Sequence, residues 1–367
     1  MIPGGFDAAP VAVLTSRYMT RNRHRAEFQP DELSAVLALF DLGAIHGIEP
    51  QAKGSHRSPK VLVTSDRGRF LLKRRATGRD DTAKVAFAHR VQRHLAARHF
   101  PLAHLVGVRG SQDTLVMREG EIYELFQFVR GEPYDRSAES TADAGRVLGR
   151  FHRLLRGFQG HWEASRRGYH DSQCVRHNLS GVPAAVGKDD SVSGRESELL
   201  ATVTALYGMY ENASDRVNEA RFPDWPEQIV HADWHPGNML FSQGRIAAVI
   251  DYDSLRVLPP VTDVANGVLQ FSIIGGPLDP RAWPAELDEE RLRGFLHGYD
   301  QEAALPPEQV RALPWLMIEA LIAEAVLPIA ATGSFGRIEG FRFLQMISRK
   351  VRWLEQNGER LVAPVKA

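Results

Sequence analysis

Four polar residues between positions 231 and 253 have the types and spacing that phosphoryl transfer requires. Asp233 is followed five residues later by Asn238. Asp251 comes thirteen residues after Asn238, and Asp253 lies two residues further on. In phosphoryl-transfer enzymes, an Asp at this distance before an Asn accepts the proton of the attacking hydroxyl, and the Asn holds magnesium. The spacing therefore predicts a centre that orients a hydroxyl and supplies oxygen ligands to Mg²⁺.

A hairpin would bring these residues together. Two apolar runs, 239–241 and 246–250, are predicted to be short strands joined by a turn that contains glycine. The second strand returns to the start of the first, so Asp251 should lie beside Asn238, where both could reach one hard cation. Asp233 would remain free to face the acceptor.

Two other interpretations of this segment compete. The residues around Pro236 are also ordinary turn formers, although this leaves the downstream Asp pair unexplained. Alternatively, His231, Asp233 and His235 could hold zinc or iron. Imidazoles at alternate positions share a face only in a strand, whereas the Pro-Gly pair that follows them favours a loop.

The segment resembles the aminoglycoside phosphotransferase and choline kinase-like superfamily, including its homoserine kinase-like branch. Members carry a His-x-Asp-x-His-x-x-Asn loop, a hydrophobic strand and an Ile-Asp-x-Asp segment, and all three occur here. The resemblance implies Asp233 as catalytic base, with His231 as structural support of the loop. It also implies Asn238 and Asp251 as magnesium ligands. Asp253 would touch a second metal or the substrate, or cap local backbone.

Length and composition are those of a globular enzyme. The chain has 367 residues, 43% hydrophobic and 25% charged, which is enough for two domains with cores of their own. Cys174 is the only cysteine, so no intrachain disulfide can form. No charged start leads into a long apolar run, and no segment approaches about eighteen uninterrupted apolar residues. We expect a cytoplasmic monomer or homodimer with no membrane partner.

The formal net charge of zero hides a basic region. Residues 53–98 contain thirteen Lys and Arg against three Asp. Such a field would attract a nucleoside triphosphate, although a solvated basic face or a polynucleotide surface gives the same count. No aromatic-interleaved basic stretch accompanies the charge, so no nucleic-acid partner is predicted.

The same region is predicted to form a small β-rich lobe. Runs 60–64 and 69–73 are β-rich and are separated by a Ser-Asp-Arg-Gly hairpin signal. In the superfamily, a Lys at the end of the second strand contacts the nucleotide phosphates, which implies that role for Lys73. Gly54 and Ser55 lie where a phosphate-covering loop would be expected, although a plain surface turn fits equally well.

The next two elements would complete the nucleotide site. Residues 82–98 show a helical apolar face that would pack behind it. Many relatives place a Glu on this helix to pair with the strand Lys, but here the helix carries no carboxylate, and His89 is a possible substitute. Residues 122–129 are predicted to be the last small-lobe strand. The resemblance implies that backbone around Gln127 and Phe128 receives the adenine of ATP, although a simple edge strand would look the same.

The second half of the chain is predicted to be helical. A first helix would be capped by Ser140 or Thr141 and would contain His152 in a structural role. Further helices are indicated at 199–210, 291–299, 310–327 and 341–354. Strands early and helices late indicate an α+β, protein kinase-like fold. Its parts would be an N-terminal extension (1–30), a nucleotide-binding N-lobe (31–129) and a larger helical C-lobe (130–367).

The acceptor is less well defined by the sequence. Glu319 and Glu324 lie five residues apart on an apolar helix, where buried carboxylates need partners and could recognise an ammonium group. Helix capping or internal Arg pairing accounts for them equally well. Asp263 resembles a superfamily position that stabilises the catalytic loop. A zinc site is also conceivable at His161, His170, Cys174 and His177, but the intervals are unlike those of zinc modules.

Together these patterns predict an ATP- and Mg²⁺-dependent phosphotransferase. The γ-phosphate would pass to a hydroxyl of a small molecule, with amino acids, amino alcohols, aminoglycosides and sugars as candidates. A protein Ser/Thr kinase is an alternative, but the chain lacks a DFG-type triplet and an APE-like segment. A catalytically silent nucleotide-binding or scaffold protein is another.

Overall fold

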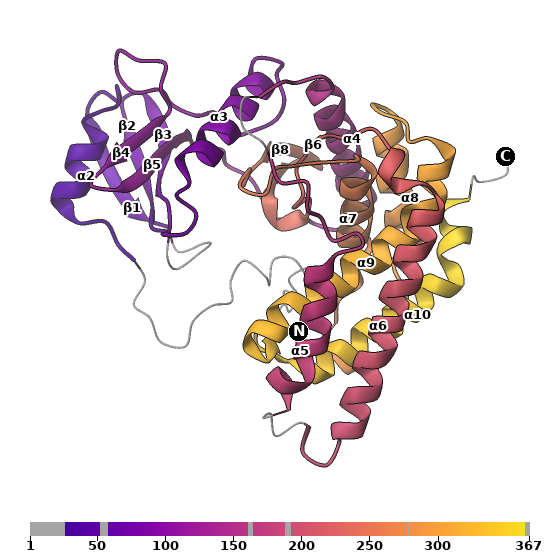
Figure 1. Ribbon diagram of the computed structural model, residues 1–367. Helices are drawn as coiled ribbons and strands as arrows, with labels where there is room; N and C mark the ends of the chain where they lie inside the picture. The colour runs from indigo at the N-terminus through magenta and orange to yellow at the C-terminus, as the bar shows by residue number, and fades with distance from the viewer. Residues whose placement is uncertain (1–25, 52–57, 161–163, 188–191, 277–278, 364–367) are drawn as a thin grey trace, which may run out of the picture.

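The computed structural model describes residues 26–51, 58–160, 164–187, 192–276 and 279–363. These residues form a β-rich lobe and a larger helical lobe, joined near residue 130 (Figure 1). The predicted α+β, two-lobed fold is therefore confirmed. The expected phosphate-covering loop at Gly54 and Ser55, and most of the expected extension at 1–30, lie outside the described residues.

The small lobe is built on an antiparallel sheet with strand order β1-β2-β3-β5-β4. Its strands are β1 Ile45–Pro50, β2 Lys60–Ser65, β3 Gly68–Arg74, β4 Leu115–Arg118 and β5 Glu121–Gln127. β2 and β3 form the predicted hairpin, closed at Gly68, whose φ of 121° favours glycine. Helix α2 (Pro30–Leu37) packs on the sheet, and Val36 joins strand residues such as Val63 in a core separate from that of the large lobe.

Helix α3 (Thr82–Ala96) packs with the large lobe, although it lies between small-lobe strands in the sequence. The Asp81 side chain caps it by accepting hydrogen bonds from two backbone N–H groups of the first turn. Its buried face contributes to the large-lobe core, where the rings of Phe87 and Phe158 meet edge-on with centroids 6.4 Å apart. Figure 1 shows α3 between the sheet and α4.

Helices make up most of the large lobe. They are α4 Ala138–Leu155, α5 Gln173–Val186, α6 Glu196–Glu219, α7 Val261–Ser272, α8 Glu289–Asp300, α9 Pro307–Thr332 and α10 Gly340–Val362. The four later predicted helices lie within α6, α8, α9 and α10. The predicted cap of α4 is wrong: Ser137 caps it by accepting from the Ser140 N–H at 3.1 Å, and Ser140 and Thr141 are buried in the first turn.

Glycines allow α4 and α8 to approach closely. A Cβ added at Gly145 of α4 would lie 1.9 Å from the Phe295 carbonyl oxygen. A Cβ added at Gly298 of α8 would lie 1.9 Å from the Ala142 carbonyl oxygen. No side chain fits at such distances, so backbone packs against backbone at this crossing.

Helix α9 is the central helix of the large lobe and packs against α5, α6, α7 and α10. It is apolar almost all round, as expected of a helix buried on every side. By length and composition α9 could also cross a membrane, and it is the one such helix among the residues described; most of it is buried within the protein. We therefore interpret α9 as a core helix.

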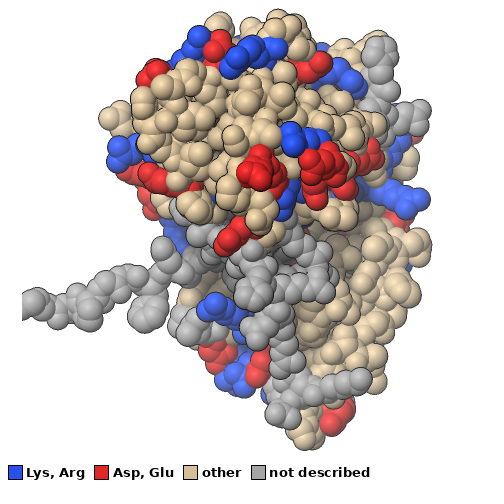
Figure 2. Space-filling model, turned by 90° about the vertical axis from the view of Figure 1, so that its left-hand side faces the viewer, with Lys and Arg blue, Asp and Glu red and all other residues tan. Residues whose placement is uncertain are grey.

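The basic region, residues 53–98, is partly neutralised by acidic residues from other parts of the small lobe. Arg74 pairs with Glu32 of α2 at 2.6 Å, and Arg75 pairs with Glu124 of β5 at 2.8 Å. On the face shown in Figure 2, Lys and Arg side chains are interspersed with Asp and Glu. A count within one segment therefore overstated the local charge.

Candidate active site

The catalytic loop is held from behind by Asp263, the third residue of α7. Strand β6 (Gln228–Val230) leads into the loop, and the Asp263 carboxylate accepts hydrogen bonds from the backbone N–H groups of His231 (2.6 Å) and Ala232 (2.7 Å). His152 of α4 lies 3.2 Å from the same carboxylate through Nε2. Ala232 has a φ of 59°, a left-handed conformation that these bonds stabilise. These contacts agree with the structural roles expected for Asp263 and His152.

Asp233 projects from this loop with 38% of its side chain exposed. Its Oδ2 accepts a hydrogen bond from the Asn238 amide at 2.9 Å, and its Oδ1 lies 3.4 Å from Nε2 of His235. Burial alone would raise the pKa of Asp233, but its hydrogen bonds with His235 and Asn238 and its electrostatic interactions with the His235 and His231 rings lower it to about 2. The carboxylate is therefore ionised and can accept a hydrogen bond from an incoming hydroxyl.

His235 and His231 differ in their surroundings. Nδ1 of His235 accepts a hydrogen bond from the Gly237 N–H at 3.0 Å, which directs the proton on Nε2 towards Asp233. His231 is fully buried, and its ring lies 5.4 Å, centroid to centroid, from both Trp234 and Tyr252. Burial lowers the pKa of His231, and its ring nitrogens have no hydrogen-bond partner within the described chain. His231 thus supports the loop by packing.

The predicted hairpin forms from β7 (Met239–Ser242) and β8 (Arg245–Val249). The Ile250 N–H donates to the Asn238 carbonyl at 2.9 Å, so the next residue, Asp251, lies beside Asn238 as expected. Because the Asn238 amide nitrogen donates to Asp233, its Oδ1 is left as an acceptor. Asp251 has a φ of 67°, in the left-handed region.

Asn238 and Asp251 suit Mg²⁺ in the chemistry of their donors. Both offer oxygen, which magnesium prefers, and Mg²⁺ commonly takes one or two protein carboxylates together with phosphate and water oxygens. Across the described ranges, no three His, Cys, Asp or Glu side chains gather into a metal cage. Neither alternative zinc site forms such a cluster among the described residues, and His161 lies outside those ranges.

Asp253, which was also predicted as a metal ligand, pairs with cations of the small lobe in this structure. Its Oδ1 accepts a hydrogen bond from Arg75 at 2.8 Å, and its Oδ2 lies 3.7 Å from Nζ of Lys73. Burial would raise the pKa of Asp253, but the charges of Lys73 and Arg75 lower it. Both oxygens face small-lobe cations, so Asp253 is a charge partner of that lobe.

Lys73 has a carboxylate partner that sequence reasoning did not identify. In the β3–β5 ladder, Lys73 is directly opposite Glu124, whose Oε2 lies 3.8 Å from Nζ of Lys73. Glu124 is 1% exposed, and His89 of α3 contacts it at 2.7 Å. His89 therefore supports a carboxylate and does not replace it. The sequence signal was an acidic residue in the middle of an apolar strand, where burial requires a partner.

The predicted adenine contacts are not available as donors. The Gln127 N–H donates to the His104 carbonyl at 2.8 Å, and the Phe128 N–H donates to the Arg69 carbonyl at 2.9 Å. Both backbone donors are used within the protein. An adenine would therefore have to find its hydrogen-bond donors elsewhere in the hinge, and a role for the backbone carbonyls of this segment stays a prediction.

Of the two predicted acceptor carboxylates, Glu324 interacts electrostatically with Asp233. Glu319 is fully buried and already accepts from the Ser214 hydroxyl (2.6 Å) and the Asp171 N–H (3.0 Å), so its substrate role is not supported. Glu324 accepts a hydrogen bond from Gln270, and burial together with the charge of Asp233 raises its pKa to about 8. Residues five positions apart on an α-helix point in directions that differ by about 140°, so the two side chains lie on different faces of α9.

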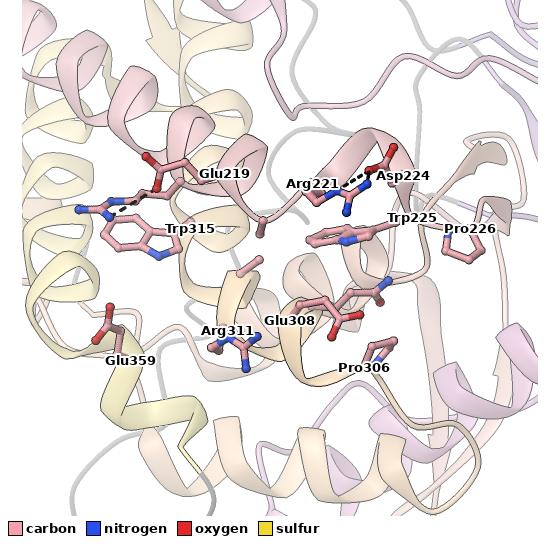
Figure 3. A pocket seen from close by; sticks show the side chains of 14 residues that line it. Glu219, Arg221, Asp224, Trp225, Pro226, Pro306, Glu308, Arg311, Trp315 and Glu359 are labelled. Carbon is pink, nitrogen blue, oxygen red and sulfur yellow. Dashed lines mark hydrogen bonds and ion pairs between the residues drawn. The ribbon is translucent and has the colours of Figure 1, made fainter.

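A separate hollow of about 930 Å³ opens between α6, α9 and α10. Figure 3 shows Trp225 and Trp315 on its walls, with Arg311 and Glu308 nearby. None of its lining residues belongs to the catalytic loop or to the Asp251 segment. The hollow is therefore distinct from the candidate active site.

Comparison with known proteins points to one family. The chain matches the phosphotransferase enzyme family over residues 48–313. It is 28% identical over 352 residues to the homoserine kinase of Afipia carboxidovorans, covering 91% of this chain and 88% of that protein.

Solved structures share the fold. An amicoumacin kinase in complex with AMP-PNP, Ca²⁺ and its ligand superposes with a TM-score of 0.62 at 16% identity, over 92% of this chain and 96% of that chain. A microcompartment-associated aminopropanol kinase gives 0.60 at 16% identity, over 90% and 98%. At these identities the likeness concerns the fold alone.

Proposed function

The chain belongs to the phosphotransferase enzyme family and is a small-molecule kinase with a hydroxyl acceptor, and from that premise we propose that ATP and Mg²⁺ are its cosubstrate and metal. The observation that carries the proposal is the grouping of Asp233, Asn238 and Asp251 at the mouth of one hairpin. This grouping combines a hydroxyl-orienting carboxylate with two oxygen ligands for a hard cation.

Each residue would have a separate task in the transfer. Asp233 would accept a hydrogen bond from the acceptor hydroxyl and fix its direction of attack. With a pKa of about 2 it is a weak base, which suits a loose transition state in which positioning matters more than early proton removal. Asn238 and Asp251 would hold Mg²⁺, which neutralises charge on the phosphate oxygens when bound. Lys73 would steady the phosphates.

We further propose that the acceptor is an amino acid. Glu324, close to Asp233, offers a carboxylate for an ammonium group. Arg256, whose charge also interacts with Asp233, offers a guanidinium for a carboxylate. An ionisable carboxyl group and a guanidinium beside the hydroxyl site complement a zwitterion better than an amino alcohol or a sugar. The named activity of the curated relatives makes homoserine the first acceptor to test.

Acceptor-dependent ATP consumption by purified protein tests the proposal. Homoserine, aminopropanol, an aminoglycoside and a sugar would be compared with and without Mg²⁺. Asp233→Asn should lower kcat on the order of 10²- to 10⁴-fold while nucleotide binding is retained. Asp224→Asn, which changes an exposed Asp paired with Arg221, is the matched control and should keep wild-type turnover. Equal turnover by wild type and Asp233→Asn would contradict the assignment.

A further inference from the structure

A buried chain of charges joins the small lobe to the segment that follows β8. Arg75, just after β3, has a guanidinium that reaches two carboxylates: Nη2 donates to Glu124 at 2.9 Å and to Asp253 at 2.8 Å. Glu124 belongs to the small-lobe sheet, whereas Asp253 belongs to the large lobe. All three side chains are largely buried, so their attraction is little screened by salt or solvent.

Glu124 is fixed from several sides. Its carboxylate contacts Lys73 and Arg75 from β3 and the segment after it, and His89 from α3. The other ring nitrogen of His89 lies 2.8 Å from the Thr114 hydroxyl, which sets the orientation of the imidazole. A carboxylate surrounded in this way keeps both cations in one geometry.

Asp253 extends this chain to the predicted metal segment, because it lies two residues after Asp251. Any movement of the small lobe relative to the large lobe that breaks the Arg75–Asp253 contact would leave the buried Asp253 carboxylate without its cation partners, which is costly. The contact therefore favours one spacing between Lys73, on the phosphate side, and Asp251, on the metal side.

We propose that Glu124 and Arg75 are positioning residues for phosphoryl transfer. Glu124 holds Lys73 towards the nucleotide phosphates, and Arg75 ties that strand end to the Asp251–Asp253 segment through Asp253. The proposal rests on the proposed ATP-dependent function. The buried Arg75–Asp253 contact would thus align Lys73, on the phosphate side of the site, with Asp251, on the metal side.

Substitutions of Glu124 and of Arg75 should change different kinetic constants. Glu124→Gln should raise the KM for ATP roughly 10- to 100-fold, because small misplacements of a phosphate contact have effects of that size, and leave the KM for the acceptor unchanged. Arg75→Met should mainly lower kcat by a similar factor, because Lys73 keeps Glu124 as partner. Glu124→Asp, which keeps the charge, should recover part of the loss.

A double-mutant cycle tests the bridge itself. If Arg75 acts through Asp253, the combined Arg75→Met and Asp253→Asn variant should be no slower than the slower single variant. Additive losses would overturn the proposal. So would a raised Mg²⁺ requirement confined to Asp253→Asn, because that result would make Asp253 a metal ligand.

A matched control separates positioning from folding. Arg176→Met removes another half-buried guanidinium, which pairs with Glu211 at 2.6 Å outside this cluster, and should lower the melting temperature without changing either KM. Affinity for MgADP is measured in parallel, so that the test does not depend on the acceptor. Wild type that binds MgADP but transfers no phosphate would count against the proposed function. Unchanged MgADP affinity in Glu124→Gln would overturn this inference.

Discussion

Glu324 is a carboxylate kept partly protonated near neutral pH, and this has a measurable effect on acceptor binding. Its pKa of about 8 reflects burial and the nearby charge of Asp233. Below that pH the group is mostly neutral in the free enzyme, and above it the group is ionised. An ammonium acceptor should pair with the ionised form only.

We therefore predict that the KM for an amine-bearing acceptor falls as pH rises from about 6.5 to about 8.5. In Glu324→Gln this dependence should disappear, and the KM should be high throughout. Steady-state kinetics across this range check the prediction. Glu319→Gln is a poor control because that residue is buried in a hydrogen-bond network, so Glu308→Gln, on the surface hollow of Figure 3, serves instead. A pH profile shared by wild type and Glu324→Gln would contradict the role.

Single residues could be predicted from the sequence where their geometry is local. Asn238 and Asp251 are brought together by one tight hairpin, so their spacing in the chain was enough to place them. Glu124 could not be found this way, because its position opposite Lys73 depends on the register between β3 and β5, which are separated by a helix and a strand. The pairing of Asp253 with Arg75 could not be found either, for the same reason: the two residues lie 178 positions apart in the chain.

At the scale of elements, the close crossing of α4 and α8 requires a residue without a side chain at one position of α8. Gly298 faces the Ala142 carbonyl, whereas Gly294, on the same helix, has open space at the position of a Cβ. An added methyl group should overpack the first position and only improve helix propensity at the second.

We predict opposite changes in the free energy of unfolding for two matched variants. Gly298→Ala should destabilise the protein by about 1–3 kcal/mol, because α8 must move away from α4. Gly294→Ala should stabilise it by up to about 1 kcal/mol, because alanine loses less backbone entropy in a helix. Denaturant titration of both variants checks this. Equal effects at the two positions would show that the helices do not cross as closely as described.

Helix positions were predictable at this scale, but helix partners were not. The apolar periodicity that indicated α3 gives its buried face correctly, yet it does not say which core that face enters. We expected α3 to pack behind the nucleotide site, but only His89 of this helix contacts Glu124, the partner of Lys73. Most of the apolar face of α3 is buried in the large-lobe core. Tertiary packing decides that choice, and no local pattern encodes it.

At the scale of the whole molecule, two separate cores divide the chain. The small-lobe core comprises residues of α2, the segment after it and the sheet, whereas the large-lobe core includes α3 and the helices around α9. A smaller core buries less apolar surface and resists local opening less. The lobes should therefore differ in local stability.

We predict that backbone amides of β1, β2 and β3 exchange with solvent deuterium faster than those of α9. Amides of α3 should follow the large lobe, because its apolar side chains are buried there. MgATP, which would contact both lobes, should slow exchange in the sheet. Hydrogen-exchange mass spectrometry with and without nucleotide measures all three. Exchange of α3 together with the sheet would contradict the division of cores.

Glu124, the carboxylate partner of Lys73, lies on a strand and not on a helix. This difference affects how such an enzyme could be regulated. In protein kinases the corresponding Glu is on a helix, and moving that helix switches the enzyme off. Here Lys73 and Glu124 are neighbours on adjacent strands, so they cannot separate unless the sheet itself comes apart. Compounds that trap a displaced helix would find no such state in this lobe.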